Sequence, residues 1–493
     1  MISKDRKYIW HPFTQMKDWQ TEDFPVIDRG EGCTLIDTEG RRYLDGVSSL
    51  WCNVFGHRVP AIDKAIKKQL GKIAHTTFLG LTHPLAIELA EKLIAIAPKE
   101  KKEGLSSPNA LIGDPDREKN GFPLTLKGCC AETCGNDKQG KPSQHDGKRK
   151  LTRVFYSDSG SEAMEIALKM AYQYWQQRGQ PQKKKFAKLT NAYHGDTIGS
   201  VSLGGIDLFH QIYKPLLFET LAIPSPYRYR WSTGDDPELV KKESLEAMEK
   251  ALRENQGELA AFVMEPLMQG AAGMIDQPAG YISRARELTR KYNTLLIFDE
   301  VATGFGRTGK MFAAEHEGVT PDIMAVAKGI TGGYLPLAAT LTTEEVYEAF
   351  LGDYEDFKAF FHGHTYTANP LACAAAVATI DLFQKDRTLE KLQPKIRLMQ
   401  NRLKDFYKLS AVGDIRQAGT MIGIELVKNK ATKESFEVKE KIGVRVIELA
   451  RKKGAILRPL GPVIVLMPPL AMSERELNKL LDITYESIKE ATE

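Results

Sequence analysis

The chain has 493 residues, of which 42% are apolar and 27% charged, and its formal net charge is +4. This length allows about two to four domains, and the composition excludes disordered, collagen-like and coiled-coil chains. The nearly balanced charge gives no reason to expect a nucleic acid or an anionic membrane as the main partner.

The chain start and the cysteine content both predict a cytoplasmic protein. The first residues, MISKDRKYIWHPFTQMKDW, lack the apolar run of a signal peptide, and no stretch approaches the ~18 apolar residues of a membrane span. Six cysteines are too few for a disulfide framework in a chain of this length. They are Cys33, Cys52, Cys129, Cys130, Cys134 and Cys373.

The first strongly periodic segments are two helices followed by a polar stretch. Apolar residues recur at helical spacing over 61–72 and 84–97. The next segment, 99–150, has only 11 apolar residues among 52. So few apolar side chains cannot easily offset the entropy of ordering, which predicts a long surface insertion.

The polar insertion holds four residues of metal-ligand type: Cys129, Cys130, Cys134 and His145. A structural metal site usually takes its cysteines from paired Cys-x-x-Cys arms, and none is present here. We therefore expect no metal site.

After the insertion, short apolar runs alternate with helical patterns. The predicted strands are 151–157, 260–266, 294–300 and 322–328, and the predicted helices include 161–179 and 280–292. Alternation of this kind predicts an α/β fold with a mostly parallel sheet.

The last hundred residues show a different order of predicted helices and strands. A helix begins near 385, two strand-rich stretches (413–427 and 454–469) follow, and an amphipathic helix ends the chain. We predict a large domain over 71–355 that contains the insertion. A small α+β domain is predicted from residues 1–70 and 356–493.

Three motifs carry residues typical of one kind of chemistry. In SDSGSEAM, Gly160 and Ser161 open a helix, where free backbone N–H groups favour a phosphate, although the same residues also suit an ordinary N-cap. In LLIFDE, Asp299 ends a buried strand, where α/β sheets bind ligands, although such a carboxylate can also simply cap a loop.

The third motif is AVAKGITGG, in which Lys328 ends a buried strand. A desolvated lysine has a lowered pKa, so that its neutral amine can form a Schiff base, although a strand-end lysine can also extend to solvent. An imine-forming lysine, an acid for a ring nitrogen and a phosphate-binding helix start together match the needs of pyridoxal phosphate.

The motifs FDEVATGFGRTG, AVAKGITGGYLP, YHGDTIG and HGHTYTANPLA resemble those of the class III aminotransferases, which have the type I fold of pyridoxal-phosphate enzymes. The resemblance covers nearly all the chain except 99–150. It implies that Lys328 holds the cofactor, Asp299 its ring nitrogen, and Gly160 and Ser161 its phosphate. Tyr193 would stack on the ring.

The same resemblance implies a homodimer with shared active sites, because Thr365 and His364 would reach the phosphate of the other subunit. The stretches IWHPFTQM, SSLWCNVFGH and RPLGPVIVLMPP are similar to the branch that aminates 8-amino-7-oxononanoate in biotin biosynthesis, usually from S-adenosylmethionine. Trp51 would pack on the chain of that keto acid and Arg458 would pair with its carboxylate. Arg307 and Asp196 would line or brace the pocket.

Two departures concern the amino donor. Phe13 stands where the branch that uses S-adenosylmethionine usually has tyrosine, and Gly363 opens a Gly-His-Thr stretch where that branch often reads Gly-Pro-Thr. Both resemble relatives that take the amino group from lysine. Lysine as donor, and a broader ω-aminotransferase, therefore stay as alternatives. A binding protein without catalysis is disfavoured by the intact Lys328 and Asp299.

Overall fold

The computed structural model describes residues 1–100 and 149–493. Its centre is a seven-stranded sheet in the order β4-β12-β11-β10-β7-β5-β6. The strands are β4 (Leu151–Ser157), β5 (Lys185–Leu189), β6 (Thr220–Ile223), β7 (Leu259–Met264), β10 (Leu295–Asp299), β11 (Ile323–Val326) and β12 (Ala338–Thr343). One of them, β12, runs in the direction opposite to the other six, so the predicted, mostly parallel α/β sheet is confirmed.

The predicted strands match this sheet closely, with one correction. The runs 151–157, 260–266 and 294–300 correspond to β4, β7 and β10. The strand predicted over 322–328 already ends at Val326, and Lys328 begins a 3-10 turn, Lys328–Thr331. The backbone of Lys328 has a φ of 46°, a left-handed conformation that a strand cannot continue.

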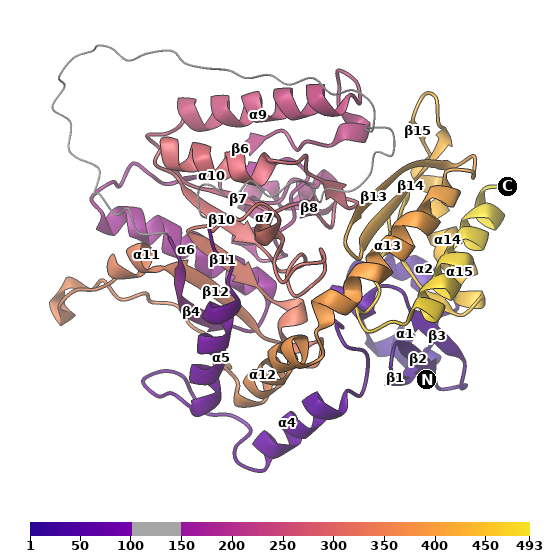
Figure 1. Ribbon diagram of the computed structural model, residues 1–493, viewed down its shortest axis with the longest axis horizontal. Coiled ribbons are helices and arrows are strands. Elements are labelled where there is room, and N and C mark those ends of the chain that lie inside the picture. Colours follow the sequence, from indigo (N-terminus) through magenta and orange to yellow (C-terminus); the bar gives the residue numbers. More distant parts are fainter. Residues whose placement is uncertain (101–148) are drawn as a thin grey trace.

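Helices cover both faces of the sheet (Figure 1). They are α5 (Pro84–Ile96), α6 (Gly160–Gln177), α9 (Pro237–Glu254) and α10 (Tyr281–Lys291). Along β7, Phe262 and Met264 join the core beneath α5, α9 and α10, whereas Ala261 and Val263 join the core beneath α6. The alternation follows from the two-residue period of a strand that is buried on both sides.

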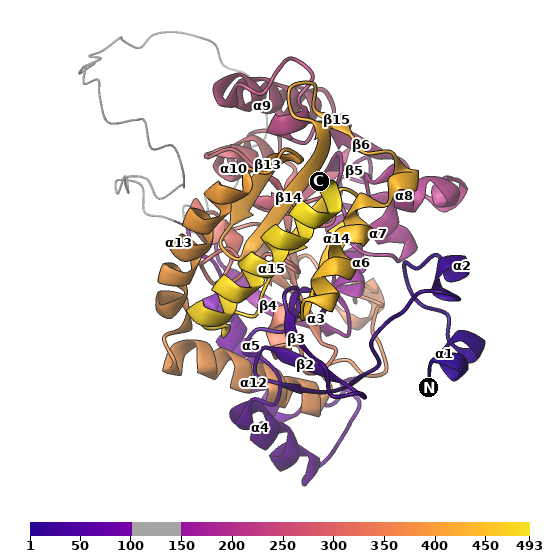
Figure 2. The ribbon, with the colours of Figure 1, turned by 90° about the vertical axis from the view of Figure 1, so that its right-hand side faces the viewer.

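The two chain ends pack together beside this sheet. They form sheets from β1 (Ile27–Glu31), β2 (Thr34–Asp37), β3 (Arg42–Asp45) and β16 (Ala455–Ile456), and from β13 (Val412–Ala418), β14 (Met421–Asn429), β15 (Glu434–Ser435), β17 (Arg458–Leu460) and β18 (Val463–Leu466). The helices α13 (Thr388–Phe406), α14 (Ile442–Lys452) and α15 (Glu474–Thr492) lie beside them (Figure 2). Because β3 pairs with β16, both ends share one sheet; the domain boundaries at 70 and 355 remain a prediction.

The remaining helices and strands complete the described parts of the chain. They are α1 (Ile2–Tyr8), α2 (Met16–Trp19), α3 (Ser48–Trp51), α4 (Pro60–Leu70), α7 (Ile198–Ser202), α8 (Asp207–His210), α11 (Glu344–Glu348), α12 (Pro370–Lys385), β8 (Met268–Gln269) and β9 (Ile275–Asp276). None of the helices in the described parts of the chain has the length and apolar character needed to cross a membrane. Most of the predicted insertion, with Cys129, Cys130, Cys134 and His145, lies outside the described residues.

A buried ion pair fastens α10 to the sheet. The carboxylate of Asp322 accepts hydrogen bonds from Arg286, at 2.8 Å, and from the backbone N–H of Leu296, at 2.7 Å. Arg149 also pairs with Asp322. Burial alone would raise the pKa of Asp322, but the two guanidinium groups outweigh burial and hold it below its usual value.

We expect Arg286→Met to lower the free energy of unfolding in urea by about 3 kcal/mol, because it leaves a buried carboxylate short of a partner. The matched control is Arg284→Met on the same helix, whose ion pairs are partly exposed and contribute less than ~1 kcal/mol. Because the pKa of Asp322 is lower in the folded chain than in the unfolded chain, the ionised carboxylate stabilises the fold fully at neutral pH. This contribution is lost as the pH falls below about 4. Equal losses in the two variants would contradict this account.

Candidate active site

A cavity of about 670 Å³ lies at the carboxyl ends of the parallel strands. Residues that follow β7, β10 and β11 line it, as the general rule for open α/β sheets predicts. Seven of the residues predicted from the sequence meet there: Trp51, Gly160, Ser161, Tyr193, Asp196, Asp299 and Lys328. The three separate motifs therefore form one site.

Lys328 reaches this cavity from a strained turn. Its φ of 46° is uncommon for a residue with a side chain, and such conformations concentrate at functional sites. The ammonium nitrogen Nζ lies 5.5 Å from the centre of the Trp51 ring. Burial lowers the pKa of Lys328, while the carboxylates of Asp299 and Glu265 act in the opposite direction. The neutral, nucleophilic amine is thus easier to form than on an exposed lysine.

Asp299 is held in place from two sides. One carboxylate oxygen, Oδ2, shares a hydrogen bond of 2.8 Å with Nδ1 of His194, and Oδ1 accepts the backbone N–H of Val301 at 3.0 Å. His194 is buried and lines the same cavity. Sequence reasoning missed His194, although it stands beside Tyr193 in the YHGDT motif. A carboxylate fixed this way can hold a protonated ring nitrogen.

The start of α6 has the features of an anion-binding turn. Ser159 and Glu162 form a capping box, which leaves other N–H groups of the first turn free toward the cavity. A Cβ on Gly160 would lie 2.7 Å from Val301, so that only glycine permits this close packing. The hydroxyl of Ser161 is hydrogen-bonded to that of Thr197 at 2.9 Å. Residue type and geometry therefore favour a phosphate here.

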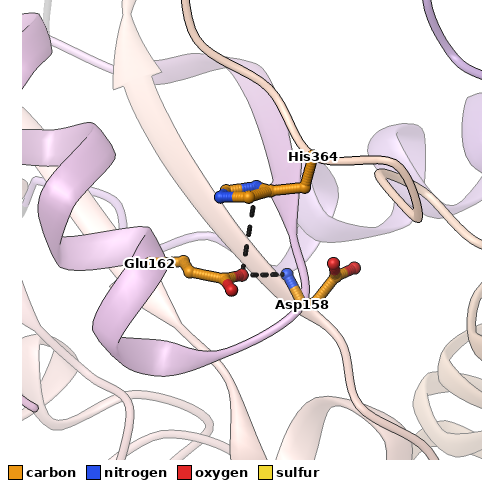
Figure 3. A group of neighbouring side chains, drawn as sticks. All are labelled: Asp158, Glu162 and His364. Carbon is orange, nitrogen blue, oxygen red and sulfur yellow. Dashed lines mark hydrogen bonds and ion pairs between the residues drawn. The ribbon is translucent and has the colours of Figure 1, made fainter. Parts of the chain in front are cut away.

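One further group borders this turn. Figure 3 shows the ring of His364 above the first turn of α6, facing Glu162 and Asp158. Their nearest ligand-type atoms lie within 4.8 Å of one another, a spacing that a cation could span. However, Oε2 of Glu162 already accepts the backbone N–H groups of Asp158 and Ser159. The expectation of no metal stays a prediction.

Arg458 lies close to the cavity without a partner for its charge. It is half-buried on β17, and the titratable group that acts on its charge is Tyr193, a lining residue whose hydroxyl donates to Asp196 at 2.9 Å. Within residues 1–100 and 149–493, no carboxylate pairs with its guanidinium. Burial lowers the pKa of Arg458, and Tyr193 opposes this only in part. A half-buried cation of this kind is a good binding group for an anionic ligand.

Arg307 lies deeper than a lining residue. It is fully buried, and its guanidinium donates to Oγ of Ser48 and to the carbonyl oxygens of Asn53 and Pro468 at 2.9–3.0 Å. These contacts join the two chain ends and support the turn that carries Trp51. Trp51 itself is 6% exposed, with a φ of 65°.

Six predicted residues do not line the cavity: Arg307 and Arg458, described above, and Phe13, Gly363, His364 and Thr365. Phe13 is 60% exposed and packs its edge on Phe209, with ring centres 5.5 Å apart. Gly363 and Thr365 are exposed on a loop, and His364 faces Glu162 at the start of α6 and packs on His362, with ring centres 5.0 Å apart. A single subunit therefore does not bring this loop to its own cavity.

Glu265 is a site residue that sequence reasoning did not single out. It is buried, follows β7 and lines the cavity. The signal was present, because the predicted strand 260–266 runs into this carboxylate as the strand 294–300 runs into Asp299. Glu300, by contrast, follows β10 but turns away from the cavity toward Thr303, Ala313 and Ala314.

These residues fit pyridoxal phosphate. The α6 turn suits the phosphate, Asp299 suits a protonated pyridine nitrogen, and the neutral amine of Lys328 suits an aldehyde. All three line one cavity large enough for a cofactor and a small substrate.

Comparisons with known proteins identify the family of the chain. The family model "Aminotransferase class-III" matches residues 16–107 and 137–488. The adenosylmethionine-8-amino-7-oxononanoate aminotransferases of Geobacter sulfurreducens and Aquifex aeolicus are each 48% identical, over 99% of this chain and 97% and 96% of theirs. The crystal structure of the Methanocaldococcus jannaschii aminotransferase of that name has a TM-score of 0.85 and 42% identity, over 99% of this chain and 98% of that one. An ω-transaminase of Pseudomonas jessenii, in complex with PMP, has a TM-score of 0.86 and 28% identity, over 100% of this chain and 98% of that one. The chain belongs to the class III aminotransferases.

Proposed function

We propose that the chain uses pyridoxal phosphate to transfer an amino group from S-adenosylmethionine to 8-amino-7-oxononanoate, giving 7,8-diaminononanoate. Arg458 carries the proposal, since it is a half-buried cation with no carboxylate partner in the described parts of the chain. The keto acid has a carboxylate at the end of an aliphatic chain. Relatives named for this reaction are 48% identical over nearly the whole chain, whereas the ω-transaminase structures reach 28–31%.

Each site residue has a defined task in this reaction. When bound, pyridoxal phosphate supplies a ring that accepts the electrons of the broken Cα–H bond. Lys328 moves the proton at that α-carbon through Nζ. Asp299, oriented by His194, keeps the ring nitrogen protonated. The large apolar surface of Trp51 packs on the aliphatic chain of the keto acid and excludes water.

The amino donor is the part of the proposal with a specific rival. Phe13 lacks the hydroxyl that the branch using S-adenosylmethionine usually has, which favours lysine as a second candidate. Phe13 is exposed and packs on Phe209, so its ring lies outside the cavity formed by the same chain. Relatives named after adenosylmethionine favour the first candidate.

The donor is tested by supplying each compound separately to the cofactor-loaded protein, removing it by gel filtration, and then adding the keto acid. We expect S-adenosylmethionine to give at least about tenfold more diamine per enzyme than lysine. More diamine from lysine would reverse the donor assignment and leave the acceptor assignment intact. Amination of simple ketones but not of the keto acid would support a broader ω-aminotransferase instead.

We also propose that the working form is a homodimer with shared sites. The loop that carries Thr365 exposes Phe361 and Tyr366, and the ring of Tyr366 lies 4.7 Å from that of His75. Leu79, on the same stretch as His75, is 90% exposed. Exposed large apolar side chains of this kind are typical of a subunit interface. The free thiols of the three described cysteines agree with the cytoplasm as its location.

Mixed dimers test the shared site. The subunit with Lys328→Ala and the subunit with Thr365→Asp should each be inactive, the second because a carboxylate repels the phosphate. In a dimer purified with two different tags, one site would combine an intact Lys328 with the other subunit's intact Thr365. We expect about half the wild-type turnover to return. No recovery in the mixed dimer would contradict sharing.

A further inference from the structure

Glu265 is a buried carboxylate that forms no ion pair within the described parts of the chain, although it interacts with the charge of Lys328 at longer range. It is 4% exposed, and no lysine, arginine or histidine within residues 1–100 and 149–493 lies at ion-pair distance from it. Both of its oxygens are occupied by backbone donors. The N–H of Tyr193 donates to Oε1 at 3.2 Å, and the N–H of Gly270 donates to Oε2 at 2.8 Å. Burying a carboxylate costs free energy, and the two backbone hydrogen bonds offset part of that cost.

The two donors belong to segments on different walls of the cavity. Tyr193 is a lining residue whose ring stands beside the site. Gly270 lies against Trp51, since a Cβ at Gly270 would be 3.3 Å from Cζ3 of the Trp51 ring. That ring in turn lies over Lys328. One carboxylate therefore joins the segment behind Tyr193 to the segment behind Trp51.

We propose that Glu265 is a positioning residue that sets the separation between Tyr193 and Trp51, and thereby the binding of the acceptor's chain. A carboxylate suits this task because it accepts at both oxygens, whereas the amide of a glutamine would turn an NH₂ group toward one of the two N–H donors. The kinetic part of the proposal rests on the proposed function, because it uses the keto acid.

A structural feature of this chain provides a matched control. Glu300 also directly follows a central strand, is fully buried and accepts two backbone N–H groups, from Ala313 and Ala314 at 3.0 and 2.8 Å. Burial raises the pKa of Glu300 and the pKa of Glu265 alike, to about 7. The difference is that Glu300 does not line the cavity.

The first measurement is amide hydrogen exchange in the cofactor-free protein and in the holoenzyme. In Glu265→Gln we expect exchange at Tyr193 and Gly270 to rise about tenfold, the effect of one lost hydrogen bond. In Glu300→Gln the increase should instead appear at Ala313 and Ala314. This readout is independent of which substrate the enzyme uses, so a failure of the proposed function does not affect it.

The second measurement separates positioning from general stability. Glu265→Gln should raise the KM for the keto acid about tenfold with a smaller change in kcat, while Glu300→Gln should leave both within about twofold. If Glu265→Gln does not fold, Gly270→Ala presses directly on Trp51 and should raise the same KM without faster exchange at Tyr193. Unchanged exchange at both amides, or equal kinetic losses in the two glutamine variants, would overturn the proposal.

Discussion

We expect Lys328→Ala to abolish turnover, with a loss of roughly a thousandfold or more, because in the proposed reaction this one side chain both holds the cofactor covalently and acts as the base at the donor's α-carbon. The lysine stands at the cavity in a left-handed turn, with its pKa lowered by burial. Treatment with cyanoborohydride should fix pyridoxal phosphate to the wild-type chain and not to the variant. Intact-protein mass spectrometry measures the difference.

A second buried lysine serves as the control. Burial lowers the pKa of Lys183 to about 8, yet its ammonium donates to three backbone carbonyl oxygens and does not line the cavity. Lys183→Met should reduce stability and leave cofactor attachment unchanged. Normal turnover in Lys328→Ala, or a loss of attachment in Lys183→Met as well, would show that the cavity lysine has been misidentified.

Arg458→Ala should raise the KM for 8-amino-7-oxononanoate by roughly 10–100-fold, the range expected when a charge-assisted, bidentate contact with a carboxylate is removed. The KM of Arg458→Lys should lie between those of the wild-type enzyme and Arg458→Ala. An ammonium keeps the positive charge but lacks the planar guanidinium that can make two parallel hydrogen bonds to a carboxylate. The donor's half-reaction should change much less. Steady-state kinetics with the keto acid as the varied substrate measures the effect.

The methyl ester of the keto acid makes this test specific. It removes the negative charge from the substrate, so it should bind the wild-type enzyme as weakly as the acid binds the alanine variant. Arg458→Ala should then show no further loss with the ester, because the interaction is already absent. If the variant loses as much with the ester as with the acid, Arg458 does not pair with the carboxylate.

The sequence predicts most of the sheet because its strands are buried on both faces. Continuous apolar runs such as 294–300 have few other structures available, and Asp299 ends its strand as expected. Lys328 shows where this reasoning stops. The strand before it ends at Val326, two residues before the predicted end. The turn that follows depends on the packing of the glycines after Lys328, and such a turn has no periodic pattern of apolar residues in the sequence.

Residues that act through contacts distant in sequence were hardest to predict. His194 reaches Asp299 across 105 positions, and Arg307 joins segments that lie more than 150 positions away. Glu265 was open to prediction by the strand-end rule, but one carboxylate after one strand is a weak signal. The sequence also could not place Thr365 in a site of one chain, since the phosphate that it is proposed to contact lies in a second subunit.

The comparisons add information on the segment 99–150, which the composition alone marks as an insertion. Alone, its composition reads as an insertion into an aminotransferase. However, the alignment with the Geobacter sulfurreducens relative spans 99% of this chain and 97% of that relative. The family model omits 108–136. The segment therefore lies within a chain that aligns with this relative over nearly its whole length, although part of it lies outside the family model.

Transfer of labelled nitrogen tests the central claim most directly. The purified protein, loaded with pyridoxal phosphate, is incubated with 8-amino-7-oxononanoate and with S-adenosylmethionine that carries nitrogen-15 in its amino group. Mass spectrometry of the acceptor should show 7,8-diaminononanoate with one heavy nitrogen, and none with Lys328→Ala. A keto acid that stays unchanged, whichever donor is supplied, would contradict the proposed function.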